Sequence, residues 1–135
     1  MYVNRDTVEI TVDSNGDGTD YTGIVNGRIL SIEYVRDPDS PANDYLEPTS
    51  PTLGFDFTIT TEDTTQNLWV ETGITGAKTI APRQATHNTA GVASLYSTDN
   101  SEPVEDYVFV FDERVKIIVA NAGSLTTGSF TILWG

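Results

Sequence analysis

The chain has 135 residues, no cysteine and a formal net charge of −13, from 20 acidic and seven basic residues. This length predicts one domain over residues 1–135, large enough to bury a core without cross-links. The absence of cysteine excludes disulfides and thiolate metal sites. The strong negative charge predicts repulsion from phosphate backbones and anionic lipids, so we expect neither nucleic acid nor a membrane as a partner.

Strand patterns begin close to the first residue, because apolar and polar side chains alternate over residues 7–12. There is no apolar segment typical of a signal peptide or a membrane helix, so we expect a protein made and used without export. A second strand is predicted over residues 28–35. The alternation places Leu30 and Ile32 on one face of this strand and Ile29 on the other.

The segment between these strands carries oxygen-bearing side chains at alternate positions: Asp13, Asn15 and Asp17, with Asp20 close behind. Converging oxygens of this kind can hold Ca²⁺, and the spacing is similar to the first half of an EF-hand loop. However, the twelfth position is Ile24 where a bidentate glutamate is expected, and no helices flank the loop. The Asn-Gly and Asp-Gly pairs equally predict a turn between strands, so both interpretations stay open.

The stretch 36–54 holds four of the six prolines and four acidic residues, which predicts a long surface loop or arm. Strand patterns resume at residues 55–60 and 68–72. In the second of these, Trp69 lies on the face opposite Leu68. Trp69 could belong to a sugar-binding platform, but packing in a core or between subunits is favoured.

Residues 72–98 contain no aspartate or glutamate but carry Lys78, Arg83 and His87. In so acidic a chain, this segment is the natural candidate for a contact face. His87 is the single histidine, and no serine lies in a Gly-x-Ser-x-Gly context, so the chain offers no nucleophile with its base. A chance pair of carboxylates could in principle hydrolyse glycosides, but we expect a binding or structural protein rather than an enzyme.

The last third of the chain predicts three strands. Residues 107–111 are apolar on both faces, which is typical of a central strand covered on both sides. A tight turn is predicted at Asp112 and Glu113, followed by strands over 114–120 and 129–134.

Many short strands and no helical periodicity predict an all-β fold, a single-domain antiparallel β-sandwich or barrel of jelly-roll type with long loops. The alternation also predicts the residues that form its core: Val8, Ile10, Ile32, Phe57, Ile59, Val108, Val110, Ile117, Val119 and Ile132.

Four runs, at residues 12–21, 55–62, 81–87 and 114–120, together resemble a family of small virion structural proteins of tailed bacteriophages. The resemblance spans nearly the whole chain and implies a place in the virion, reached by assembly in the host cytoplasm. It brings no catalytic motif and no cofactor. The segment 37–53 is longer than the corresponding link in the proteins that the chain resembles.

Within that family, the size and acidity of the chain favour a capsid decoration (cement) protein. Such a protein binds the major capsid protein on the outer head surface, and by analogy it forms a homotrimer. Lys78, Arg83 and His87 are then the expected capsid contacts. Two alternatives remain: a head–tail connector or tail component, and a cation- or carbohydrate-binding β-sandwich.

Overall fold

The computed structural model describes residues 2–36, 39, 41, 44–48, 53–97 and 101–135. The described residues form an all-β domain with antiparallel pairing and no helix, as the sequence predicts. No helix in this part of the chain is long and apolar enough to cross a membrane. The strands are β1 (Asn4–Thr11), β2 (Gly18–Val35), β3 (Phe55–Thr61), β4 (Asn67–Ile74), β5 (Lys78–Ile80), β6 (Arg83–Ala85), β7 (Glu105–Tyr107), β8 (Phe109–Ala120) and β9 (Thr127–Trp134).

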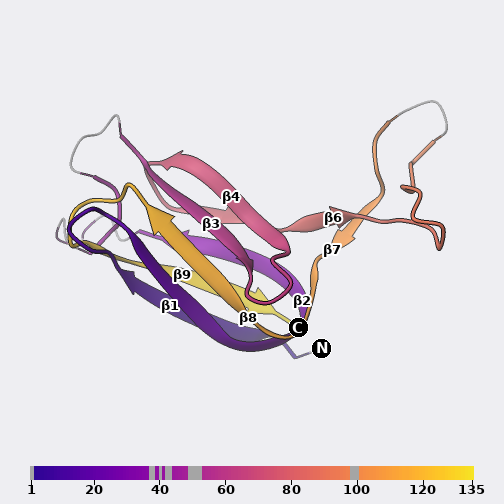
Figure 1. Cartoon of the computed structure of the whole chain (residues 1–135), viewed down its shortest axis with the longest axis horizontal. Coiled ribbons are helices and arrows are strands. Elements are labelled where there is room, and N and C mark those ends of the chain that lie inside the picture. The colour runs from indigo at the N-terminus through magenta and orange to yellow at the C-terminus, as the bar shows by residue number, and fades with distance from the viewer. Residues whose placement is uncertain (1, 37–38, 40, 42–43, 49–52, 98–100) are drawn as a thin grey trace.

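Seven strands form one sheet in the order β1-β9-β2-β8-β3-β4, with β5 paired to β2. The second half of β2 pairs with β9 and β5, and its first half pairs with β8. The long β2 therefore passes from one layer (β1, β9, β2, β5) into the other (β2, β8, β3, β4), as Figure 1 shows. The strand order itself was beyond the sequence prediction.

Two irregularities bend the β2–β8 pair where the layers meet. On β2, Thr22 and Gly23 oppose a single residue of β8, and the Thr22 hydroxyl accepts a hydrogen bond from the Val115 amide at 3.0 Å. On β8, Phe111 and Asp112 oppose Asn26, whose side-chain oxygen accepts from the Asp112 amide at 2.7 Å. Such bulges increase twist and let one strand serve both layers.

The predicted hairpin turn at Asp112 and Glu113 is therefore wrong, because β8 runs without a break from Phe109 to Ala120. Asp112 does have a positive φ of 50°, the conformation that the turn prediction assumed, but here it forms a bulge. The prediction of a strand covered on both faces is also wrong. Phe109 and Phe111 are 43% and 74% exposed, while the residues between and before them are buried.

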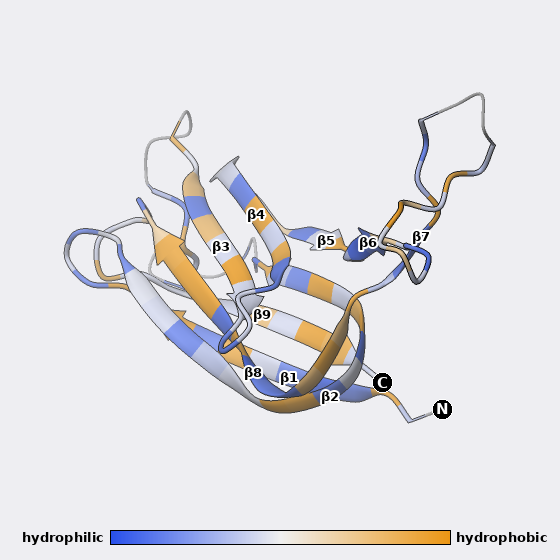
Figure 2. Ribbon diagram, turned by 45° about the vertical axis from the view of Figure 1, so that its right-hand side comes forward, coloured by the Kyte–Doolittle hydropathy of each residue, from blue (hydrophilic) through white to orange (hydrophobic). Residues whose placement is uncertain are grey.

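All ten residues predicted for the core are buried, and they belong to a single apolar cluster between the layers. Four aromatic rings form its centre. Tyr34 packs edge-on against Phe55 at 4.9 Å between centroids, and Phe130 contacts both Tyr34 and Phe57 at 5.4 Å. Figure 2 shows the alternation of apolar and polar residues along these strands.

Two side chains differ from simple alternation. The pairing of β2 with β9 shifts between Ile29 and Ser31, so Ile29 is fully buried and Leu30 is only partly covered. In β4, Leu68 and Trp69 are both buried, at 6% exposed each. The favoured interpretation of Trp69 as a packed residue is thus confirmed within this chain, where its ring meets Phe57 edge-on at 4.5 Å.

The proline-rich stretch 36–54 is not wholly a surface loop, although several of its residues lie outside the described part of the chain. Leu46 and Glu47 are buried. The Tyr34 hydroxyl donates to the Glu47 carboxylate and accepts from the Leu46 amide, so the stretch returns to the core. Burial, followed by the contact with Glu47, raises the pKa of Tyr34 above its ordinary value. Arg36 lies 3.1 Å from Glu47 as an ion pair, without the alignment of a hydrogen bond.

Strands β6 and β7 form a separate two-stranded sheet that points away from the two layers (Figures 1 and 2). We call residues 83–107 the arm. Its pairing continues past the strands through isolated bridges between His87 and Ala93 and between Leu95 and Pro103. The described residues of the arm are absent from the apolar cluster of the body.

Candidate functional site

The loop at residues 13–20 is built as a turn around one carboxylate. Oδ1 of Asp13 accepts hydrogen bonds from the amides of Asn15 at 2.8 Å and Asp17 at 3.0 Å. The Asp13 amide in turn donates to the Asp17 carbonyl at 2.9 Å. Asp20 accepts from the amide of Tyr21 outside this turn. The Asp13 side chain thus forms an Asx-turn, in which the carboxylate accepts hydrogen bonds from backbone amides of the same loop.

A second loop closes over this turn. The amide of Ala122 donates to the Gly16 carbonyl at 3.0 Å, and the amide of Leu125 donates to the Asp13 carbonyl at 3.0 Å. Gly16 has a φ of 80°, and a Cβ on it would stand 2.0 Å from the Ala122 carbonyl oxygen. The contact leaves room for glycine alone.

This arrangement does not bring the predicted oxygen ligands together. Within the described residues, no group of three or more His, Cys, Asp or Glu side chains is placed to hold a metal ion. The turn joins β1 to β2, which are not paired with each other because β9 lies between them. The geometry favours the turn interpretation over the cation site.

The acid-free segment 72–98 does not form one face. Lys78 lies on β5 at the body, where its Nζ binds both oxygens of Glu71 at 2.8–2.9 Å. This contact lowers the pKa of Glu71 below its ordinary value and neutralises the lysine. A pocket of about 300 Å³ adjoins this pair, but residues 71–78 of the β4–β5 turn alone line it. It is the inner side of a turn rather than a cleft between elements.

Arg83 lies at the root of the arm and is exposed. Its guanidinium stacks over the Tyr107 ring at 4.1 Å and donates to the carbonyl of Pro82 at 2.9 Å. Arg28 approaches the ring of the same tyrosine at 5.4 Å. In the described part of the chain, no carboxylate pairs with Arg83, so its planar group is held in place and faces solvent.

His87 lies further along the arm, exposed, in a small hairpin that Asn88 closes. The Asn88 side chain accepts from the amides of Ala90 at 2.9 Å and Val92 at 3.0 Å. The structure therefore separates the three predicted contact residues. Lys78 belongs to the body, while Arg83 and His87 belong to the arm.

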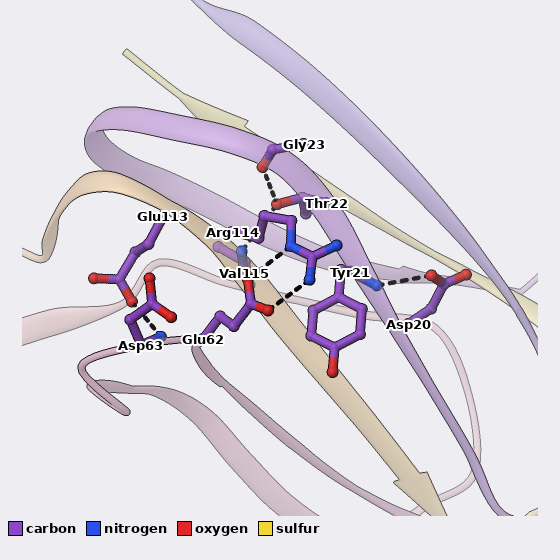
Figure 3. A network of polar contacts seen from close by, with 9 residues as sticks. All are labelled: Asp20, Tyr21, Thr22, Gly23, Glu62, Asp63, Glu113, Arg114 and Val115. Atoms are coloured by element: carbon purple, nitrogen blue, oxygen red, sulfur yellow. Dashed lines mark hydrogen bonds and ion pairs between the residues drawn. The ribbon is translucent and has the colours of Figure 1, made fainter.

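A polar network holds the outer surface of the β2–β8–β3 layer (Figure 3). Arg114 donates to both oxygens of Glu62 at 2.5–2.6 Å, and its guanidinium covers the Tyr21 ring at 4.1 Å. The hydrogen bonds from Arg114 lower the pKa of Glu62, and they raise the pKa of Arg114 in return. A bidentate pair of this geometry fixes both side chains, so we regard it as a structural clamp.

Sequence reasoning missed two apolar surfaces. The first is the aromatic strip, which consists of Tyr107, Phe109 and Phe111 at alternate positions. Phe109 and Phe111 are exposed, whereas Tyr107 is half-buried under the guanidinium of Arg83. The Phe109 and Phe111 rings are 12° from parallel with centroids 6.4 Å apart. The run of five apolar residues carried no signal of exposure, because alternation cannot tell which of two apolar faces is covered.

The second surface is the arm tip, which we define as Val92, Leu95 and Tyr96. These side chains are 60%, 44% and 69% exposed. Their sequence context could have indicated this exposure. The segment around them is short and contains Gly91 and many polar residues, so it cannot bury an apolar face by itself.

Comparison of the chain with protein-family models, with curated proteins and with solved structures finds no match.

Proposed function

We propose that this protein is a structural component of a tailed-bacteriophage virion, a decoration protein that binds the major capsid protein on the outer surface of the head. The proposal rests on the resemblance of the sequence, and the arm is the observation that supports it best. A protein that joins capsid subunits needs an element that reaches beyond its own body. The arm is such an element, and none of its described residues belongs to the core.

The residues at the base of the arm are suited to such a contact. Arg83 is exposed, is stacked on Tyr107 and has no carboxylate partner in the described residues. A guanidinium fixed in this way loses little freedom when it pairs with a carboxylate on another protein. Arginine and tyrosine are also enriched among residues that dominate binding energy at interfaces. Arg83 is therefore the capsid contact that we test first.

Lys78 is a weaker contact in this proposal than the sequence suggested, because Glu71 already neutralises it. A capsid carboxylate would have to compete with that internal pair. Lys78 thus provides a matched control for Arg83, with the same charge in the same acid-free segment but on the body rather than on the arm.

The experiment is rebinding of purified protein to heads stripped of it, followed by sedimentation. Arg83→Glu is expected to weaken attachment by about 2–5 kcal/mol, as for a broken charge pair in an interface, while Lys78→Gln attaches like the parent. The melting temperature of each free variant shows whether its fold is intact. Rebinding of Arg83→Glu at parental strength would exclude this contact.

A head–tail connector or tail component is the second candidate, because a projecting arm suits a ring of subunits equally well. The number of copies per virion distinguishes the two. A decoration protein is present in near-stoichiometric ratio to the capsid protein, whereas a connector is confined to a single ring.

A further inference from the structure

Residues 44–48, which we call the strap, lie against the body without joining its sheets. β2 ends at Val35 and β3 begins at Phe55, so the strap is outside the strand pairing. Leu46 is nevertheless fully buried, and it is the one described residue between these two strands that belongs to the apolar cluster. The strap therefore adds a single apolar side chain to the core.

Leu46 fits into a space on β9 that a glycine leaves open. A Cβ on Gly128 would stand 2.6 Å from Cγ of Leu46 and 3.4 Å from Cε1 of Tyr34. Beside this space, the Gly123 amide donates to the Leu46 carbonyl at 2.9 Å, and among the described residues this is the single backbone hydrogen bond between the strap and the body. Docking of the strap thus depends on the fit at Gly128 and on one backbone contact at Gly123.

Side chains supply the other contacts that hold the strap. The Tyr34 hydroxyl donates to Oε2 of Glu47 and accepts from the Leu46 amide at 3.2 Å. Arg36 lies 3.1 Å from Oε1 of Glu47 and covers the Tyr45 ring at 4.5 Å. Among the described residues, neither Arg36 Nε nor Glu47 Oε1 has a hydrogen-bond partner. A buried ion pair stabilises a contact only where aligned hydrogen bonds offset the cost of removing the charges from water, so we expect this pair to add little to docking.

We propose that the strap has two positions on the folded protein: docked, as in this structure, and undocked with both layers intact. Undocking loses the burial of Leu46 and the hydrogen bonds of the strap, whereas the pairing of β9 with β1 and β2 does not change. It uncovers the Tyr34 ring and the space beside Gly128, an apolar surface that the docked strap covers. The strap is therefore a conformational switch, and this inference does not depend on attachment to a capsid.

Amide hydrogen exchange under native conditions distinguishes undocking of the strap from unfolding of the body. The Gly123 amide reports on the strap, because its acceptor is the Leu46 carbonyl, and the Val119 amide reports on β8. In the parent, Gly123 is expected to exchange at least about tenfold faster than Val119. Ile59→Val, at a fully buried position of β3, should speed exchange at Val119 and leave Gly123 unchanged, because undocking does not open β3.

Two variants disturb the strap by unrelated routes. Tyr34→Phe keeps the ring but removes the hydroxyl that contacts Glu47 and Leu46. Gly128→Ala keeps the polar contacts and places a methyl group where Leu46 lies. Each variant is expected to speed exchange at Gly123 at least about tenfold, because a lost partner or a lost fit favours the undocked position.

Gly76→Ala is the matched control for Gly128→Ala. Apart from its chain neighbours, no atom lies within 4 Å of a Cβ on Gly76, so this variant should exchange like the parent. Equal exchange at Gly123 and Val119 in the parent, or an equal increase at both in Ile59→Val, would show that the strap opens only with the whole body and would overturn the proposal. This comparison decides the question even where a strap variant does not fold. A rate at Gly123 that folded Tyr34→Phe and Gly128→Ala both leave unchanged also overturns it.

Discussion

Glu113 is a nearly buried residue of β8, and only 6% of it is exposed. Its oxygens accept hydrogen bonds from the amides of Asp63 and Thr64 at 3.0 and 3.1 Å and from the Thr64 hydroxyl at 3.0 Å. It thereby ties the β3–β4 turn to the bulge in β8. Burial acts to raise its pKa, but the hydrogen bonds from Thr64 and Asp63 outweigh burial, and the pKa lies below its ordinary value.

We predict that Glu113→Gln lowers the free energy of unfolding by about 1.5–3 kcal/mol at neutral pH, the range for hydrogen bonds to a charged group. A carboxylate with a lowered folded pKa stabilises the protein above its unfolded pKa of about 4.3, and this contribution is lost as the pH falls through the folded pKa. The difference between the variant and the parent should therefore shrink in acid.

Denaturant unfolding at neutral and acidic pH measures this difference. Glu105→Gln is the control, because Glu105 is an exposed glutamate of β7 on the arm, and its stability should match that of the parent at both pH values. A difference between Glu113→Gln and the parent that stays constant with pH would contradict the role given to the ionised form.

The alternation of apolar and polar residues predicted the core correctly. Each strand buries one face, and the two-residue period of that face can be seen within a single strand. It failed where strands are irregular. Ile29 is buried because the β2–β9 register shifts beside it, and Asp112 bends β8 instead of ending it. Glu113 carried no sign of burial, since its partners come from a turn 50 residues earlier in the chain. Pairing between distant segments decides such details, and a single sequence does not display it.

The turn at residues 13–20 and the loop over residues 121–126 form one unit at the end of the layers. Asp13 holds the first segment, and backbone hydrogen bonds from Ala122 and Leu125 join the second to it. Oδ1 of Asp13, which could have bound a cation, already accepts hydrogen bonds from two amides. The glycine and aspartate pattern that suggested calcium is thus explained by the demands of the turn.

We predict that millimolar calcium leaves the melting temperature of the parent unchanged. Asp13→Ala should lower the free energy of unfolding by about 1–2 kcal/mol with or without calcium, because two amides lose their acceptor, and Asp13→Asn should retain most of the stability. A gain near 2.7 kcal/mol at calcium 100 times above its dissociation constant would instead establish a cation site.

In the whole molecule, the body and the arm differ in how well their apolar side chains are buried. The body has one apolar cluster that joins both layers, whereas the arm consists of short paired segments in which Val92, Leu95 and Tyr96 are exposed. Local opening requires little energy where few apolar contacts are lost, so the arm should be the least stable part of the paired structure. Composition had marked only that residues 72–98, which include the first part of the arm, contain no acids, because the exposure of apolar side chains depends on the fold as well as on the sequence.

Amide hydrogen exchange tests this division. In dilute free protein, the amides of Thr86, Ser94 and Val104, which pair within the arm, are expected to exchange orders of magnitude faster than those of Ile117 and Val119 in β8, because the latter open only with the core. Arm amides as protected as those of β8 in dilute protein would show that the arm is stable by itself and needs no partner.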